Sequence, residues 1–98
     1  MGNNNMIQLA QFCNLHNIDS TFIFALQEFE LVEIVVIENN PYLPEEQLPE
    51  VEKMLRLHYD LDINLEGIDA IATLLKRITI LEQELIAAKN KLRVFEND

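Results

Sequence analysis

The feature that most constrains this chain is a stripe of apolar residues near its C-terminus. From residue 71 onward, apolar side chains recur at alternating intervals of three and four residues, with charged residues mostly elsewhere. The stripe consists of Ile71, Leu74, Ile78, Leu81, Leu85, Ala88, Leu92 and Phe95. A heptad pattern of this kind predicts a helix of the coiled-coil type. Residues 65–98 are therefore expected to form a C-terminal helix that serves as a dimerisation segment.

The length of this helix indicates that it needs a partner. Twenty-five helical residues extend roughly 37 Å, which is more than a domain of this size can cover. Each large apolar side chain gains roughly 1.5 to 3 kcal/mol on burial, so leaving half of them in water would exceed the stability of a small domain. We expect a symmetric homodimer. Its contact residues would be Ile71, Leu74, Ile78, Leu81, Leu85, Leu92 and Phe95. The alternative is that the helix folds back on its own domain.

Residues 1–64 have the pattern of a small domain that begins with two helices. Apolar residues between Ile7 and Leu15 follow helical spacing, and residues 17–19 are typical of a tight turn. Phe22, Ile23 and Leu26 continue a second helix, for which Asp19 or Ser20 can act as N-cap. Two short helices joined by a tight turn predict a helix-turn-helix.

A small β-hairpin, or wing, is expected after the second helix. The β-branched residues between Val32 and Glu38 favour a strand, and Asn39-Asn40 tolerates the positive φ of a turn. Residues 41–44 can form the return strand, and a third helix is predicted from about Pro44 to Tyr59. Asn64 can cap the long helix that starts at Leu65. The predicted fold is therefore mostly α: a winged helix-turn-helix with a long C-terminal coiled-coil helix.

The charge distribution argues against DNA binding by this domain. The chain has a formal net charge of −10, and its first 52 residues contain no Lys or Arg. Binding a duplex requires several phosphates to be neutralised by Lys or Arg. The second helix and the wing carry acidic residues instead. We therefore interpret the domain as a degenerate winged helix-turn-helix that binds protein.

The second helix also carries three phenylalanines. Ile23 and Leu26 already define its buried side, so Phe22 or Phe24 is expected to be exposed. An exposed aromatic ring among carboxylates is typical of a docking surface for a basic protein. The candidate partner-binding residues are Phe22, Phe24, Glu28, Glu30, Glu33 and Glu38. The alternative is that all three rings are buried.

The sequence offers little for catalysis or for cofactor binding. His16 and His58 are far apart, and the single cysteine, Cys13, cannot form an internal disulfide. Ser20 stands at a helix cap, and two glycines cannot build a phosphate-binding loop. No enzyme activity, metal or cofactor is expected. The apolar runs fall short of the roughly 20 residues of a membrane span, and the lone cysteine fits a cytoplasmic protein.

The order of these elements resembles the MerR superfamily, and within it the CbpM-like chaperone-modulator family. The resemblance covers nearly the whole chain. It rests on the pair Phe12-Cys13 in the first helix and on Ile18 at the turn. It also rests on residues 55–68, in which Arg56-Leu57 and then Asp60-Leu61, an acidic residue followed by leucine, precede Gly67-Ile68. One departure is Glu30, where the family often has a glycine after the second helix.

The resemblance implies a non-enzymatic adaptor that binds the J-domain of a DnaJ-like co-chaperone of the CbpA type and inhibits it. J-domains present a basic helix, which suits an acidic adaptor. DNA-binding members of the superfamily have an arginine where this chain has Phe24, and its metal-sensing members use paired cysteines. Two alternatives remain. One is a MerR-like transcriptional regulator that contacts DNA through Lys53 and Arg56 or with a partner subunit, and the other is a purely structural oligomerisation module.

Overall fold

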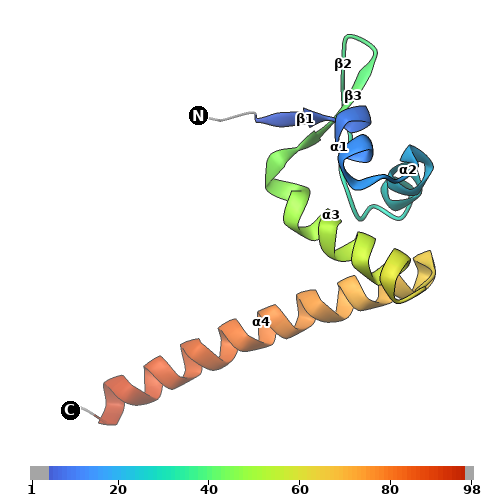
Figure 1. Ribbon diagram of the computed structural model, residues 1–98. Coiled ribbons are helices and arrows are strands. Elements are labelled where there is room, and N and C mark those ends of the chain that lie inside the picture. The colour runs from blue at the N-terminus through green and yellow to red at the C-terminus, as the bar shows by residue number, and fades with distance from the viewer. Residues whose placement is uncertain (1–4, 97–98) are drawn as a thin grey trace.

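The computed structural model describes residues 5–96, in which a small domain is followed by one long projecting helix (Figure 1). Helices α1 (Leu9–His16), α2 (Ser20–Glu28) and α3 (Leu48–Leu55) pack together beside a three-stranded sheet. Helix α4 (Leu65–Glu96) extends away from them and gives the molecule principal extents of 60 × 37 × 21 Å. The predicted fold class, a mostly helical winged helix-turn-helix with a long C-terminal helix, is confirmed.

The turn between α1 and α2 forms as predicted. Asn17 ends α1 in the left-handed conformation, with φ of 56°, and the Ile18 amide donates to the Cys13 carbonyl at 3.0 Å. Asparagine tolerates this conformation better than most residues do. The Asp19 carboxylate then accepts a hydrogen bond from the Thr21 amide at 3.0 Å, which identifies Asp19 as the N-cap of α2. Local side-chain chemistry thus determines where the first two helices end and begin.

The sheet contains one strand that the sequence pattern did not predict. Strands β1 (Met6–Gln8), β3 (Asn40–Pro44) and β2 (Val35–Ile37) lie in that order and are antiparallel. The prediction that the first helix begins at Ile7 is therefore wrong, because Ile7 pairs with Leu43 and α1 begins at Leu9. Backbone pairing with a strand more than 30 positions away along the chain outweighs the local helical spacing.

The wing is shorter than expected, and its turn lies one residue earlier. Glu38 and Asn39 form the two-residue turn with φ of 51° and 68°, so the predicted turn at Asn39-Asn40 is wrong, and Asn40 begins β3. Positive φ at both turn residues is the form that matches the twist of a hairpin. Val32 was expected in the first strand but lies buried in the core instead. The chain between α2 and β2 is attached to the domain by Gln47, whose side-chain amide makes hydrogen bonds of 2.8 and 2.9 Å to the Glu33 backbone.

The predicted third helix, from Pro44 to Tyr59, is divided into three pieces. It begins with a short 3-10 turn, η1 (Glu45–Gln47), continues as α3 and ends in a π-helical turn, η2 (Arg56–Asp60). In η2 the Leu61 amide donates to the Arg56 carbonyl at 3.2 Å, and the His58 Nδ1–H donates to the Ile63 carbonyl at 2.9 Å. This wider turn redirects the chain into α4.

Helix α4 starts as the sequence predicts. The Asn64 side chain accepts a hydrogen bond from the Gly67 amide at 2.8 Å, as expected for an N-cap. A Cβ at position 67 would lie 2.7 Å from the Ile63 Cγ2, so only glycine fits there without displacing a neighbour. None of the helices within residues 5–96 is long and apolar enough to cross a membrane.

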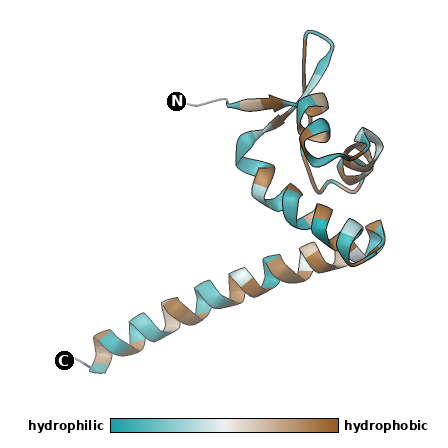
Figure 2. Cartoon of the chain, viewed as in Figure 1, coloured by the Kyte–Doolittle hydropathy of each residue, from teal (hydrophilic) through white to brown (hydrophobic). Residues whose placement is uncertain are grey.

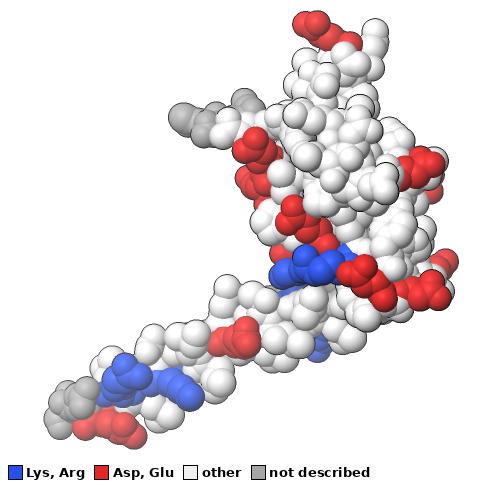
Figure 3. All heavy atoms as spheres, viewed as in Figure 1, with Lys and Arg blue, Asp and Glu red and all other residues white. Residues whose placement is uncertain are grey.

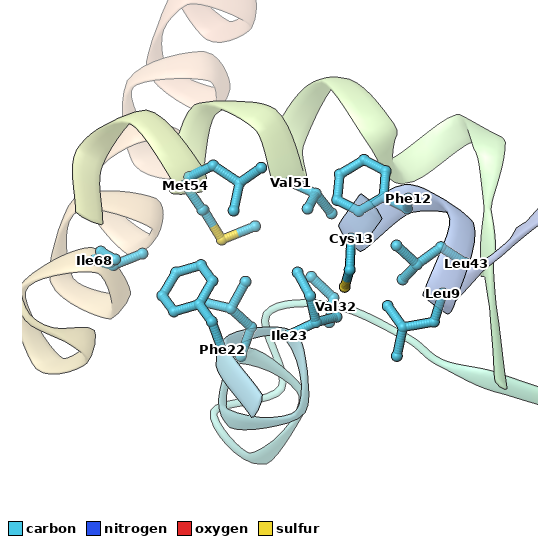
Figure 4. Close-up of a cluster of buried hydrophobic side chains, with 12 residues drawn as sticks. Leu9, Phe12, Cys13, Phe22, Ile23, Val32, Leu43, Val51, Met54 and Ile68 are labelled. Carbon is cyan, nitrogen blue, oxygen red and sulfur yellow. The ribbon is translucent and has the colours of Figure 1, made fainter. Parts of the chain in front are cut away.

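The hydrophobic core lies where α1, α2, α3 and the start of α4 meet (Figure 4). Phe12 of α1, Ile23 of α2 and Val51 of α3 are almost completely buried. Leu43 anchors the sheet to this core, and Ile68 adds the first turn of α4. The core therefore determines how α2 is presented and where α4 departs.

Candidate protein-binding surface

Helix α2 presents Phe24 to solvent and buries the other aromatic residue proposed for partner binding. Phe22 is only 7% exposed, and its ring stacks on that of His58 with the centroids 4.5 Å apart. Phe24 is 42% exposed. The assignment of Phe22 as a partner-binding residue is therefore wrong, because Phe22 lies on the core side of α2 with Ile23 and Leu26. The alternative in which all three rings are buried is also wrong.

Phe24 shares its side of α2 with polar and acidic residues. Thr21, Gln27 and Glu28 are exposed and stand three or four positions from Phe24, so they flank it on the helix surface. We call Phe24, Gln27, Glu28, Glu30 and Glu33 the α2 surface. This surface has the position of a recognition helix in a helix-turn-helix, but it presents an aromatic ring and carboxylates.

Two of its carboxylates lie beyond the end of α2 around a shallow hollow. Gln27, Glu30 and Glu33 line this hollow, which has a volume of about 320 Å³. Glu30 adopts the left-handed conformation with φ of 61°, and the Leu31 amide donates to the Leu26 carbonyl at 3.0 Å. The turn that usually takes glycine is thus formed by a glutamate, which places a negative charge beside α2.

Glu38 is separated from the other proposed binding residues. It forms the tip of the β2–β3 hairpin, which projects away from α2 (Figure 1). The structure therefore places Phe24 and Glu28 one turn apart on α2, Glu30 and Glu33 around the hollow beyond its end, and Glu38 at the wing.

A second hollow, which the sequence pattern did not indicate, lies on the α1 side of Phe24. It has a volume of about 560 Å³ and lies between α1 and the start of α2, with Ala10, Asn14 and Phe24 in its wall. Ala10 and Asn14 are both exposed and stand one turn apart on α1. Their i, i+4 spacing places them on one face of α1, and only the tertiary structure brings that face beside Phe24.

Cys13 and His16, two other side chains that could take part in catalysis or metal binding, pack against neighbouring residues of the domain. Burial raises the pKa of the Cys13 thiol, and the carboxylate of Asp19 raises it further. A buried thiol with a raised pKa is a poor nucleophile. The ring of His16 lies against that of Phe12 in a tilted arrangement, with the centroids 4.4 Å apart, and its Nε2 lies 3.6 Å from the carboxylate of Glu52. Residues 5–96 contain no cluster of three or more His, Cys, Asp or Glu suited to a metal ion.

Basic residues gather away from the α2 surface. On the face shown in Figure 3, Lys and Arg side chains lie where α3 meets α4 and near the end of α4, while the charged side chains elsewhere on the domain are Asp and Glu. Lys53 of α3 lies 3.7 Å from Glu50, an exposed ion pair within one helix. The segment from residue 5 to residue 52 contributes no Lys or Arg to the surface.

The stripe on α4 is largely uncovered. Ile71 is half-buried against the domain, but the large residues after it are between 49% and 76% exposed. They are Leu74, Ile78, Leu81, Leu85, Leu92 and Phe95. Apolar residues therefore recur along the projecting helix, as Figure 2 shows. The alternative in which α4 folds back on its own domain is wrong, because α4 leaves the domain after its first two turns.

Comparison with known families agrees with this arrangement. Residues 7–90 match the model of a family described as MerR HTH family regulatory protein. No curated protein and no solved structure matches the chain. The matched stretch runs from β1 far into α4, so it includes the helix pair α1–α2, the wing, α3 and most of the projecting helix. With these elements in this order, the chain belongs to the MerR HTH family of regulatory proteins.

Proposed function

We propose that this chain is a non-enzymatic adaptor that binds the J-domain of a DnaJ-like co-chaperone and inhibits it. The observation that carries the proposal is the α2 surface, on which Phe24 is 42% exposed and is accompanied by the carboxylates of Glu28, Glu30 and Glu33. The resemblance to the CbpM-like family suggests the partner, since J-domains present a basic helix. Occupying that helix would block the J-domain from its own target.

Two physical terms support docking of a basic protein on the α2 surface. Covering the ring of Phe24 would contribute part of the roughly 1.5 to 3 kcal/mol that full burial of a phenylalanine supplies. The surrounding carboxylates would attract Lys and Arg of the partner, which mainly increases the association rate and excludes acidic partners. The same carboxylates would repel a phosphate backbone, so they favour protein over nucleic acid.

The test is a binding titration with a purified J-domain from the same genome. We expect Glu28→Lys/Glu33→Lys to weaken binding by at least about tenfold, which corresponds to 1.4 kcal/mol. Phe24→Ala should weaken binding through lost apolar contact. The matched control is Glu45→Lys/Glu46→Lys, which makes the same change of charge on exposed residues of η1. Equal binding by the natural chain and the Glu28/Glu33 variant would remove the α2 surface as the binding site.

We further propose that the adaptor is a homodimer that forms through α4. The exposed stripe supports this, because a helix with one apolar face is stable in water only when that face is covered. A dimer would present two α2 surfaces and so could hold two J-domains or bind one bivalent co-chaperone more tightly.

The second candidate function is a DNA-binding transcriptional regulator, which the family match favours. Lys53 and Arg56 are its available phosphate contacts, and both lie at the α3–α4 junction rather than on α2. A mobility-shift titration distinguishes the two candidates. Affinity for duplex DNA that falls steeply with salt, and that Lys53→Ala/Arg56→Ala removes, would favour the regulator. The adaptor requires J-domain binding that this pair of substitutions leaves unchanged.

A further inference from the structure

Strand β2 forms an open edge of the three-stranded sheet. The strand order β1-β3-β2 places β3 on one side of β2, and no other strand of residues 5–96 lies on its second side. The β2–β3 hairpin projects beyond the packed helices (Figure 1). An edge strand of this kind has backbone N–H and C=O groups to which another chain can add a strand.

The register of the hairpin identifies which backbone groups of β2 face this edge. In a hairpin closed by a two-residue turn, the pair next to the turn is hydrogen-bonded on the inside, and the following pair is not. Ile37 with Asn40 is therefore a bonded pair, and Val36 with Pro41 is not. Pro41 suits this position, because proline has no N–H to donate. The amide and the carbonyl of Val36 consequently point outward, away from β3.

The residues before β2 extend this edge. At Glu33 the inward side is occupied by the Gln47 side chain, which makes hydrogen bonds of 2.8 and 2.9 Å to the Glu33 amide and carbonyl. Backbone groups alternate between the two sides of an extended chain, so Glu33 shares the inward side with Ile37. Ile34 and Val36 therefore present their amides and carbonyls to the open edge.

The side chains along this edge are apolar, and the residues on either side of it are acidic. Val36 is 65% exposed and Ile37 is 44% exposed, on opposite faces of the strand. Glu33 precedes β2 and Glu38 follows it, and both are exposed. The chain has no Lys or Arg before residue 53 to offset these carboxylates. The edge therefore favours a strand that combines apolar residues with Lys or Arg.

We propose that the open edge of β2 binds an extended basic segment of a partner protein, which adds a fourth strand to the sheet. The backbone of the segment pairs with Ile34 and Val36, and an apolar side chain of the segment covers Val36. Its Lys or Arg side chains approach Glu33 and Glu38. The edge shares only Glu33 with the α2 surface, and the backbone of β2 takes no part in the J-domain docking proposed above. The two proposals can therefore fail separately.

A second copy of the chain suits this edge less well than a basic segment does. An antiparallel pair of β2 strands centred on Val36 would bring Glu38 of each copy beside Glu33 of the other, and like charges across a strand pair are destabilising. The opposite edge strand, β1, offers less apolar surface, because Met6 and Ile7 are partly buried. The carboxylates thus favour a partner of opposite charge at β2.

Backbone methylation of a peptide tests the pairing directly. The probe is a short synthetic peptide in which lysine and valine alternate, titrated into the isotope-labelled full chain while the amide resonances are followed by NMR. We expect saturable shifts at Ile34 and Val36. N-methylation of the valine amides, which would face β2, should weaken binding by at least about tenfold. N-methylation of the lysine amides, which would face away from β2, is the matched control and should change the affinity little.

Substitution of Val36 tests the same pairing from the side of the chain. Val36→Pro removes the outward amide and leaves the inward donors of β2 in place, so the peptide should no longer bind. Val36→Thr keeps the amide and a β-branched side chain, and it should retain binding. Unchanged amide resonances outside the hairpin show that the domain of each variant is folded. If Val36→Pro disrupts the hairpin, the two methylated peptides still decide the question.

The contribution of charge is measured with the same peptide. Glu38→Lys should weaken its binding by about threefold or more, because the substitution replaces attraction at the end of β2 by repulsion. Glu45→Lys makes the same change of charge on an exposed residue of η1 and should have little effect. Equal weakening by these two variants, or by the two methylated peptides, would mean attraction by net charge alone and would overturn the inference. Failure of the unmodified peptide to bind would overturn it as well.

Discussion

Glu30 has a backbone conformation that few side chains adopt. Its φ of 61° is left-handed, and the turn after α2 depends on it because the Glu30 and Leu31 amides bond to the last carbonyls of the helix. For a residue with a Cβ this conformation costs roughly 1 to 2 kcal/mol, whereas glycine adopts it without a steric penalty. The chain tolerates that cost at a position where a carboxylate faces the hollow beside α2.

We expect Glu30→Gly to stabilise the protein by about 0.5 to 1 kcal/mol, since relief of strain exceeds the added entropy of an unfolded glycine. Urea denaturation followed by circular dichroism measures the change in the free energy of unfolding. Glu30→Ala is the control, because it removes the same charge and keeps the strain. If Glu30→Ala stabilised the protein as much as Glu30→Gly, the loss of the negative charge and not the relief of strain would be the cause.

At the scale of elements, the corner between α3 and α4 depends on close packing around Gly67. The amide of Gly67 is bonded by the Asn64 cap, and its missing Cβ leaves room for the Ile63 side chain. The π-helical turn η2 is attached to the same corner through the hydrogen bond from His58 to Ile63. This corner sets the direction in which α4 leaves the domain.

Replacing a glycine within a helix by alanine commonly stabilises it by about 1 kcal/mol. Here we expect Gly67→Ala to destabilise the protein instead, by about 1 kcal/mol or more, because the new Cβ would lie 2.7 Å from the Ile63 Cγ2 and disturb the cap. The measurement is the midpoint of urea denaturation. In an Ile63→Ala background, which removes the opposing methyl group, the same substitution should become neutral or stabilising. A stabilised single variant would contradict the close approach.

At the scale of the whole molecule, the domain and the projecting helix have different sources of stability. The domain has its own core, while most of α4 exposes its apolar face along the 60 Å length of the molecule. The proposed dimer would supply the stability of such a helix, and formation of that dimer would depend on protein concentration.

We therefore expect the thermal midpoint of the natural chain to rise with protein concentration, as a dimer requires. Leu81→Glu/Leu85→Glu places charges in the stripe and should abolish that dependence by preventing association. Gln83→Glu adds a charge to the same segment outside the stripe and should retain it. Circular dichroism melts over a hundredfold range of concentration test this. A midpoint independent of concentration in the natural chain would contradict dimerisation.

Much of the candidate binding surface could be predicted from residue types alone. The carboxylates of α2 and the wing and the lack of Lys and Arg before residue 53 are properties of the sequence. Residue types did not predict which phenylalanine is exposed, because Phe22 and Phe24 stand on different sides of one helix. The choice between them depends on where α3 and η2 pack. His58 in η2, 36 positions from Phe22, is one of the residues that cover its ring.

The sequence by itself determined that a helix, a tight turn and a second helix capped at Asp19 or Ser20 open the domain. It also determined that Asn64 caps the long helix and that this helix carries a heptad stripe, because each feature depends on residues within a few positions of one another. Only the tertiary structure decided that residues 6–8 form a strand, that Val32 enters the core and that Glu38 and Asn39 make the turn. These outcomes depend on contacts between distant segments, such as Ile7 with Leu43. A local pattern contains no information about which distant backbone will supply the missing hydrogen bonds or cover an apolar side chain.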